Sequence, residues 1–112
     1  MDLTIWHNPR CSKSRQTLAL IEAREPTVRL YLTDAPSEAE LRAAATALGV
    51  APIKMMRTGE PEFKAESLSQ DSSEDTLFAA MARMPKLIER PIVFAGEKAV
   101  IGRPPEAVLS LL

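Results

Sequence analysis

The chain has 112 residues, enough for one domain with a hydrophobic core, and its 46% hydrophobic and 26% charged residues are ordinary for a soluble protein. A formal net charge of −1 gives no electrostatic reason to expect a nucleic acid or a membrane as a partner. No apolar run approaches the roughly 20 residues of a transmembrane helix, and the N-terminus lacks the pattern of a signal peptide. One cysteine excludes an internal disulfide and a cysteine zinc cluster, so we expect a cytoplasmic protein.

The first third of the chain is predicted to form a β-α-β unit. Residues 3–6 are rich in β-formers, Pro9 breaks this strand, and apolar residues then recur at helical spacing to Ile21. Glu25-Pro26 marks a break, after which residues 28–32 alternate as a second strand. The two strands of such a unit are normally parallel and joined right-handedly.

The middle of the chain is predicted to be helical. Ser37 and Glu40 form a capping-box pattern that opens a helix to about Leu48, and Gly49 is well placed to close this helix. Three further segments follow: a short helix from Pro52 to near Gly59, an irregular stretch over residues 60–71, and a helix from Ser72 or Ser73 to Pro85.

The C-terminal part is predicted to contain a β-hairpin and a last helix. Residues 92–95 and 99–101 are the strands, residues 96–98 are the turn, and Pro104-Pro105 opens the helix. The element order is therefore β-α-β, then helices, then β-β-α. This order indicates an α/β, thioredoxin-like fold with a mixed four-stranded sheet and a helical insertion, in a single domain over residues 1–112.

Cys11 falls at the junction between the first strand and the first helix. The backbone N–H groups of a first helical turn have no intrahelical partners and carry partial positive charge, which favours a thiolate. His7, Arg10 and Lys13 are expected to act in the same direction. An isolated cysteine can also be an inert core residue, but these polar and cationic neighbours favour a reactive thiolate at Cys11.

Three arginines lie where the core pattern does not require them. Arg57 follows a short helix, Arg90 precedes Pro91 at the start of a strand, and Arg103 follows the hairpin. Arg90 and Arg103 flank the hairpin, so both could reach the same end of the sheet and bind an oxyanion through paired N–H donors. A cis peptide bond at Pro91 would present backbone to a substrate at the thiol.

The spacing Cys11-Ser12-Lys13-Ser14 has a serine where a dithiol redox protein has its second cysteine. A dithiol protein can resolve its own mixed disulfide, whereas a protein with one thiol cannot. We therefore expect the second thiol to come from outside, from glutathione or a glutaredoxin-like partner.

Four spaced motifs resemble the glutaredoxin-coupled arsenate reductase family, closest to its short branch, and the resemblance runs nearly end to end. They are His7-Asn8-Pro9-Arg10-Cys11-Ser12-Lys13-Ser14-Arg15, Arg57, Glu89-Arg90-Pro91-Ile92-Val93 and Gly102-Arg103-Pro104-Pro105-Glu106. The best-known reductases of the family have Gly-Thr where this chain has Ser12-Lys13, and they continue further at the C-terminus.

The resemblance implies a nucleophilic Cys11, an arginine triad of Arg57, Arg90 and Arg103 around arsenate, a His7 that favours the thiolate, and a Ser14 that supports the loop. It also implies glutathione as a co-substrate and a glutaredoxin-like protein as a partner. No metal and no tightly bound cofactor are expected, and the protein is expected to be a monomer.

Two other functions are compatible with the same residues. One is a monothiol oxidoreductase that acts on glutathionylated proteins or other thiol substrates. The other is a binding role like that of the Spx transcription regulators, which are relatives by fold. Most Spx proteins carry C-x-x-C, which Ser14 interrupts here, so this hypothesis ranks last.

Overall fold

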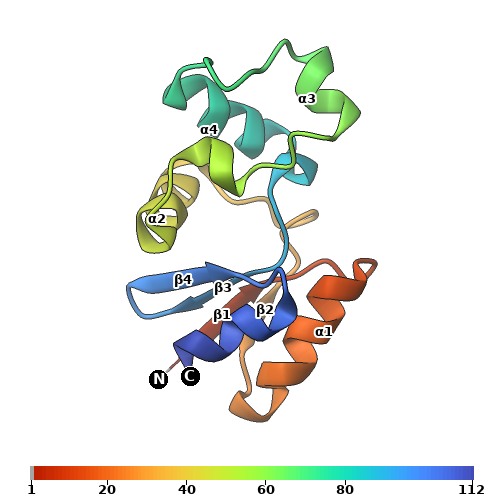
Figure 1. Cartoon of the computed structure of the whole chain (residues 1–112), viewed down its shortest axis with the longest axis vertical. Helices are drawn as coiled ribbons and strands as arrows, with labels where there is room; N and C mark the ends of the chain where they lie inside the picture. The colour runs from red at the N-terminus through yellow and green to blue at the C-terminus, as the bar shows by residue number, and fades with distance from the viewer. Residues whose placement is uncertain (1) are drawn as a thin grey trace. The chain divides into compact units, whose positions relative to one another are not determined.

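Two units make up residues 2–112, the part of the chain that the computed structural model describes (Figure 1). The sheet unit comprises residues 2–34 and 90–112, and the helical unit comprises residues 35–89. The helical unit therefore corresponds to the insertion expected between the two halves of the sheet.

The sheet unit contains a four-stranded mixed sheet in the order β2-β1-β3-β4. Strand β1 pairs in parallel with β2 and antiparallel with β3, and β3 pairs antiparallel with β4. Its elements in chain order are β1 (Leu3–Trp6), α1 (Ser12–Ile21), the 3-10 helix η1 (Glu22–Arg24), β2 (Thr27–Arg29), β3 (Ile92–Ala95), β4 (Lys98–Ile101) and the 3-10 helix η4 (Pro105–Leu111).

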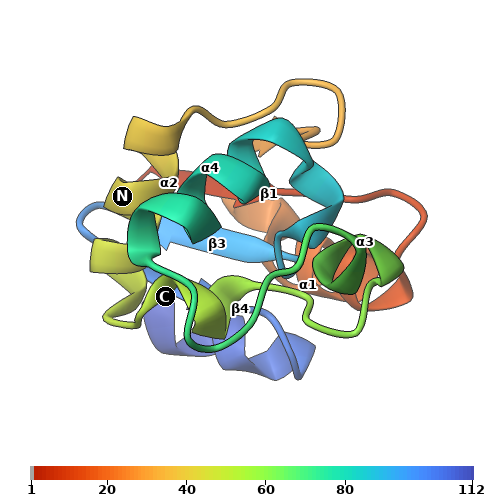
Figure 2. The same cartoon turned by 90° about the horizontal axis from the view of Figure 1, so that it is seen from above.

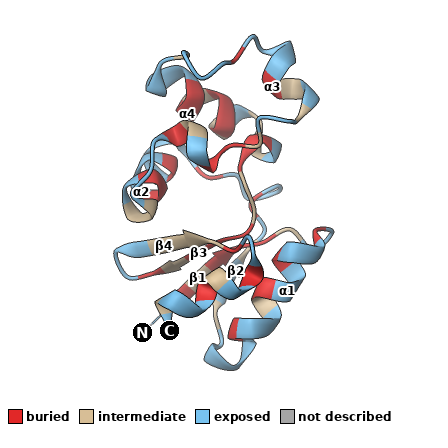
Figure 3. Ribbon diagram, viewed as in Figure 1, coloured by how far each residue is buried: buried red, intermediate tan, exposed pale blue. Residues whose placement is uncertain are grey.

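A compact apolar core joins this sheet to α1 and η4. Ile5 of β1 is in register with Val93 of β3, and both side chains are fully buried. Ile21 of α1 and Val108 of η4 belong to the same buried cluster. Figure 3 shows the buried stretches of the strands and of α1 in red. Each such side chain contributes about 1.5–3 kcal/mol through removal from water, so this core anchors the helix that carries Cys11.

The helical unit contains three α-helices and two 3-10 helices among the described residues. Helices α2 and α4 lie side by side, as Figure 2 shows from above. The elements are α2 (Glu38–Leu48), η2 (Pro52–Met55), α3 (Pro61–Ala65), α4 (Glu74–Arg83) and η3 (Pro85–Leu87). The most deeply buried side chains of this unit include Leu41, Met55, Leu77, Met81 and Leu87.

The predicted helix caps of this unit are confirmed. Ser37 Oγ accepts a hydrogen bond from the Glu40 N–H, the Glu40 carboxylate accepts one from the Ser37 N–H, and Gly49 adopts the left-handed conformation with φ 71°. Ser73 caps α4 by accepting from the Thr76 N–H. The hydrogen bonds of a helix cap join residues close together in the sequence, so a few residues are sufficient to specify where α2 and α4 begin and where α2 ends.

Some element boundaries differ from the sequence predictions. The second strand ends at Arg29, not at residue 32, because the chain turns and the N–H groups of Thr33 and Asp34 both donate to the Leu30 carbonyl. The segment 60–71 is not wholly irregular. It contains α3, which begins at Pro61 and buries Phe63.

The C-terminal elements also differ in detail. The β-hairpin has a two-residue turn, with Lys98 already in β4 and Gly96 at φ 61°. The last helix is a 3-10 helix, not an α-helix. Across residues 2–112, every helix is too short or too polar to span a lipid bilayer.

Candidate active site

Cys11 is the N-cap residue of α1, with the extended backbone angles φ −99° and ψ 121°. The loop that leads to it from β1 is held by its own hydrogen bonds. The Cys11 N–H donates to the Asn8 carbonyl at 3.0 Å, the Arg10 N–H donates to Asn8 Oδ1 at 3.0 Å, and Arg15 Nη1 donates to the Pro9 carbonyl at 2.8 Å. The loop therefore presents the thiol at the start of the helix, as the sequence predicts.

The surroundings of Cys11 lower the pKa of its thiol. Burial is the largest single influence and raises the pKa, but it is outweighed by the Ser14 N–H, the charge of Arg90 and the Lys13 N–H. The Cys11 side chain makes no capping hydrogen bond to α1, so these N–H groups stabilise the thiolate as nearby dipoles. For Lys13, the backbone N–H contributes to the lowered pKa of the thiol.

Arg103 and Arg90 meet beside this sulfur. Arg103 Nη1 lies 3.9 Å from Cys11 Sγ and 3.4 Å from the Arg90 carbonyl oxygen. The ends of the hairpin that carry them are joined by the hydrogen bond from the Gly102 N–H to the Pro91 carbonyl, at 2.9 Å. Antiparallel pairing thus brings together two arginines that are 13 residues apart in the sequence. The Arg90–Pro91 and Arg103–Pro104 peptide bonds are both cis.

His7 and Ser14 form a buried polar pair on the same loop. His7 Nδ1 lies 2.7 Å from Ser14 Oγ, and Ser14 Oγ also accepts a hydrogen bond from the Asn8 N–H at 3.0 Å. Burial, together with the nearby charge of Arg15, lowers the pKa of His7. A neutral imidazole can accept the Ser14 hydroxyl hydrogen at Nδ1, which completes the hydrogen bonding of that hydroxyl.

The lowered pKa disfavours the cationic form of His7, which argues against a role as a positive charge beside the thiolate. That His7 favours the thiolate stays a prediction. Its contacts are with Ser14 and, through its backbone N–H, with the Arg29 carbonyl at 2.8 Å. His7 and Ser14 together support the loop around Cys11.

Arg57 belongs to the helical unit. Its N–H donates to the Leu87 carbonyl at 2.7 Å, and Met56 and Ile88 form an antiparallel bridge beside this bond. The guanidinium forms an ion pair with Glu60, and both side chains are mostly buried. The structure thus brings Cys11, Arg90 and Arg103 together within the sheet unit, with His7 and Ser14 in the supporting loop. The contacts of Arg57 described above are with Leu87 and Glu60, which both belong to the helical unit.

Asn8 is a site residue that the sequence reasoning did not single out. Its side-chain oxygen and its carbonyl each accept a backbone N–H of the loop, and its own N–H donates to Ser14. The Asn8-Pro9 dipeptide is a recognised turn signal and could have indicated this role.

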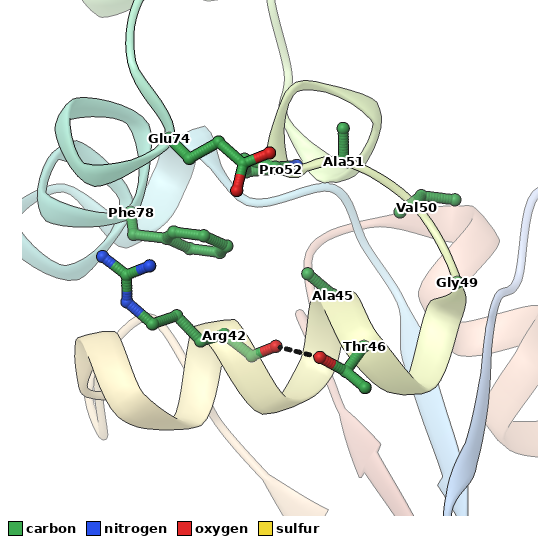
Figure 4. A pocket seen from close by; sticks show the side chains of 9 residues that line it. All are labelled: Arg42, Ala45, Thr46, Gly49, Val50, Ala51, Pro52, Glu74 and Phe78. Carbon is green, nitrogen blue, oxygen red and sulfur yellow. Dashed lines mark hydrogen bonds between the residues drawn. The ribbon is translucent and has the colours of Figure 1, made fainter.

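The helical unit has a hollow of its own, with a volume of about 500 Å³ (Figure 4). Phe78, Glu74 and Thr46 are among its lining residues, and the Arg42 guanidinium lies 4.6 Å from the Phe78 ring centre. The lining contains none of the sequence-predicted site residues and no nucleophilic thiol. Among the residues described, no group of three or more His, Cys, Asp and Glu side chains could hold a metal ion.

A cysteine at the start of the first helix, beside a four-stranded mixed sheet, defines a thioredoxin-like protein with a single cysteine. The ArsC family matches residues 6–111, and this chain belongs to that family.

Relatives of similar length support the assignment. The chain is 47% identical over 116 residues to a Haemophilus influenzae protein named arsenate reductase, with each chain wholly covered. It is 48% identical over 112 residues to the uncharacterized protein YfgD of Escherichia coli K12, covering 96% of this chain and 94% of that one. A solved structure titled arsenate reductase from Vibrio cholerae has a TM-score of 0.94 and 49% identity, covering 100% of this chain and 98% of that one.

Proposed function

We propose that this protein is an arsenate reductase that uses Cys11 as its nucleophile and glutathione as its reductant. The observation that carries the proposal is the contact between the Cys11 sulfur and Arg103, with Arg90 lowering the pKa of the same thiol. A nucleophile among guanidinium groups suits an anionic substrate, and the family membership favours arsenate among the oxyanions.

The first chemical step is attack of the Cys11 thiolate on arsenic. A sulfur–arsenic bond forms, one oxygen of arsenate takes up protons and leaves as water, and arsenic stays in its +5 state. Arg90, Arg103 and the N–H groups at the start of α1 would hold the remaining oxygens and offset their charge. Burial of the sulfur alone would disfavour the thiolate, so these donors also keep the nucleophile ready.

The second step requires an external thiol, because residue 14 is a serine. Glutathione attacks the adduct, the two sulfurs become joined as a mixed disulfide, and arsenic leaves as arsenite with the electron pair. A glutaredoxin-like protein then reduces the mixed disulfide and regenerates Cys11.

Arg57 is proposed as a third guanidinium at the oxyanion, on the basis of the family resemblance.

The test is arsenate-dependent oxidation of NADPH in the presence of glutathione, glutaredoxin and glutathione reductase. Turnover that requires all components and disappears in Cys11→Ser supports the proposal. The same mixture with a glutathionylated peptide in place of arsenate tests the alternative. Turnover of the peptide without turnover of arsenate would identify a monothiol oxidoreductase instead.

A further inference from the structure

Thr17, on the second turn of α1, touches the backbone that leads to Arg103. Its side chain is fully buried, and its hydroxyl donates to the Lys13 carbonyl at 2.8 Å and lies 3.3 Å from the Gly102 carbonyl oxygen. One hydroxyl hydrogen is therefore shared between two carbonyls. The second of these contacts joins residues 85 positions apart in the sequence.

Gly102 has no room for a side chain at this contact. A Cβ atom added there would lie 2.5 Å from Thr17 Oγ1, 2.9 Å from Thr17 Cγ2 and 2.9 Å from Pro91 Cγ. The requirement for glycine comes from the close approach of α1 to the β4–η4 connection, and the Gly102 N–H also donates to the Pro91 carbonyl.

We propose that Thr17 is a positioning residue, which sets the location of the Arg103 guanidinium relative to the Cys11 sulfur through its contact with Gly102. Arg103 directly follows Gly102, and Cys11 is the N-cap of the helix that carries Thr17. The Thr17–Gly102 contact therefore connects the segment that carries Arg103 to the helix that begins at Cys11. Arg103 Nη1 and Cys11 Sγ lie 3.9 Å apart. The inference rests on the proposed function, because its consequence is a correctly spaced oxyanion site.

The experiment measures how well arsenate protects Cys11 from a neutral alkylating agent such as iodoacetamide. The arsenate concentration that halves the alkylation rate reports anion binding and does not depend on turnover or on a reducing partner. Gly102→Ala should raise this concentration about tenfold, the loss expected for one displaced charge-assisted contact. Thr17→Val keeps the branched shape, removes only the hydroxyl, and should raise the concentration about threefold.

A second-site variant separates positioning from general damage. Thr17→Ala added to Gly102→Ala removes both Thr17 atoms that crowd the new Cβ, so protection should partly recover. Ile21→Val, one turn further along α1 in the core cluster, is the matched control for lost packing. Arsenate should protect Cys11 of this variant as well as it protects Cys11 of the wild type. If Gly102→Ala does not fold, the comparison of arsenate protection between Thr17→Val and Ile21→Val tests the role of Thr17. Weaker protection in Thr17→Val alone would support the role, and equal protection in both would overturn it.

The outcomes distinguish the inference from the function on which it rests. If arsenate does not protect the wild type, the proposed oxyanion site fails and this inference fails with it. If arsenate protects the wild type and all the variants equally, only the role of Thr17 is overturned. A Gly102→Ala defect that Thr17→Ala does not relieve would assign the effect to Pro91 and also overturn that role.

Discussion

The sheet unit and the helical unit differ in how their charges are arranged. The residues of the sheet unit include eight Lys or Arg and six Asp or Glu, whereas those of the helical unit include six and nine. In the helical unit, four basic side chains form ion pairs with carboxylates: Arg42 with Asp75, Arg57 with Glu60, Arg83 with Glu66, and Lys86 with both Glu60 and Glu62. The sheet unit contains the ion pair of Arg29 with Asp34.

Around Cys11 the contacts of the basic groups are of another kind. Arg103 contacts the sulfur and the Arg90 carbonyl, and Arg15 donates to the Pro9 carbonyl. A carbonyl oxygen carries no net charge, so these two contacts differ in kind from an ion pair with a carboxylate. The comparison teaches that a whole-chain net charge of −1 can conceal a positive excess in the unit that holds Cys11.

The largest effect is expected from removing the nucleophile itself. Cys11→Ser should abolish arsenate reduction, because a serine hydroxyl cannot form the thiol adduct or exchange it with glutathione. The coupled NADPH assay measures this loss. Ser12→Ala, at the next and exposed position, is the control and should retain turnover. Residual turnover in Cys11→Ser would contradict the assignment of Cys11 as the nucleophile.

The next largest effect should come from an arginine of the sheet unit. Arg90→Lys keeps the charge but loses the paired N–H geometry, which removes roughly 1.5–3 kcal/mol of transition-state stabilisation and lowers kcat/KM for arsenate about tenfold to hundredfold. Arg83→Lys is the matched control in the helical unit, where the arginine is paired with Glu66 and mostly exposed. Its kcat/KM should stay within about twofold of the wild type. An equal loss of kcat/KM in Arg90→Lys and Arg83→Lys would show that the arginine of the sheet unit has no special role in arsenate reduction.

The pH dependence of Cys11 tests the electrostatics of the site directly. The pKa of Cys11 is lowered, so alkylation by a neutral reagent should have its midpoint below the roughly 8.5 of a free cysteine. Since the chain has one cysteine, the same protein in denaturant supplies the reference. The depressed pKa favours the folded state above the unfolded pKa, and this contribution is lost as the pH falls through the folded pKa. A folded midpoint equal to the denatured one would contradict the thiolate assignment.

The smallest effect should come from the helical unit. If Arg57 contacts the oxyanion, Glu60 competes with the substrate for its guanidinium, so Glu60→Gln should lower the KM for arsenate about twofold to fivefold. Glu66→Gln, which removes the equivalent partner of Arg83, should leave the KM unchanged. A raised KM in Glu60→Gln would indicate that Glu60 holds Arg57 in place. An unchanged KM would exclude Arg57 from the anion site.

Local sequence rules predicted most elements that depend on neighbouring residues. The N-cap position of Cys11, the Ser37–Glu40 capping box and the left-handed Gly49 all follow from a few adjacent side chains and backbone groups. The hairpin over β3 and β4 was also predictable, and it accounts for the meeting of Arg90 and Arg103. These features require little long-range information, because each is satisfied within one turn or one strand pair.

The sequence by itself therefore determined the order of the elements, the position of the thiol and the arginines of the hairpin. Tertiary structure decided the rest. The lowered pKa of His7 depends on its burial, which no local pattern specifies. The contact between Thr17 and Gly102 depends on the packing of α1 against a connection 85 residues away. In the sequence Thr17 is one more residue at helical spacing, because burial and close approach arise only when distant segments pack together.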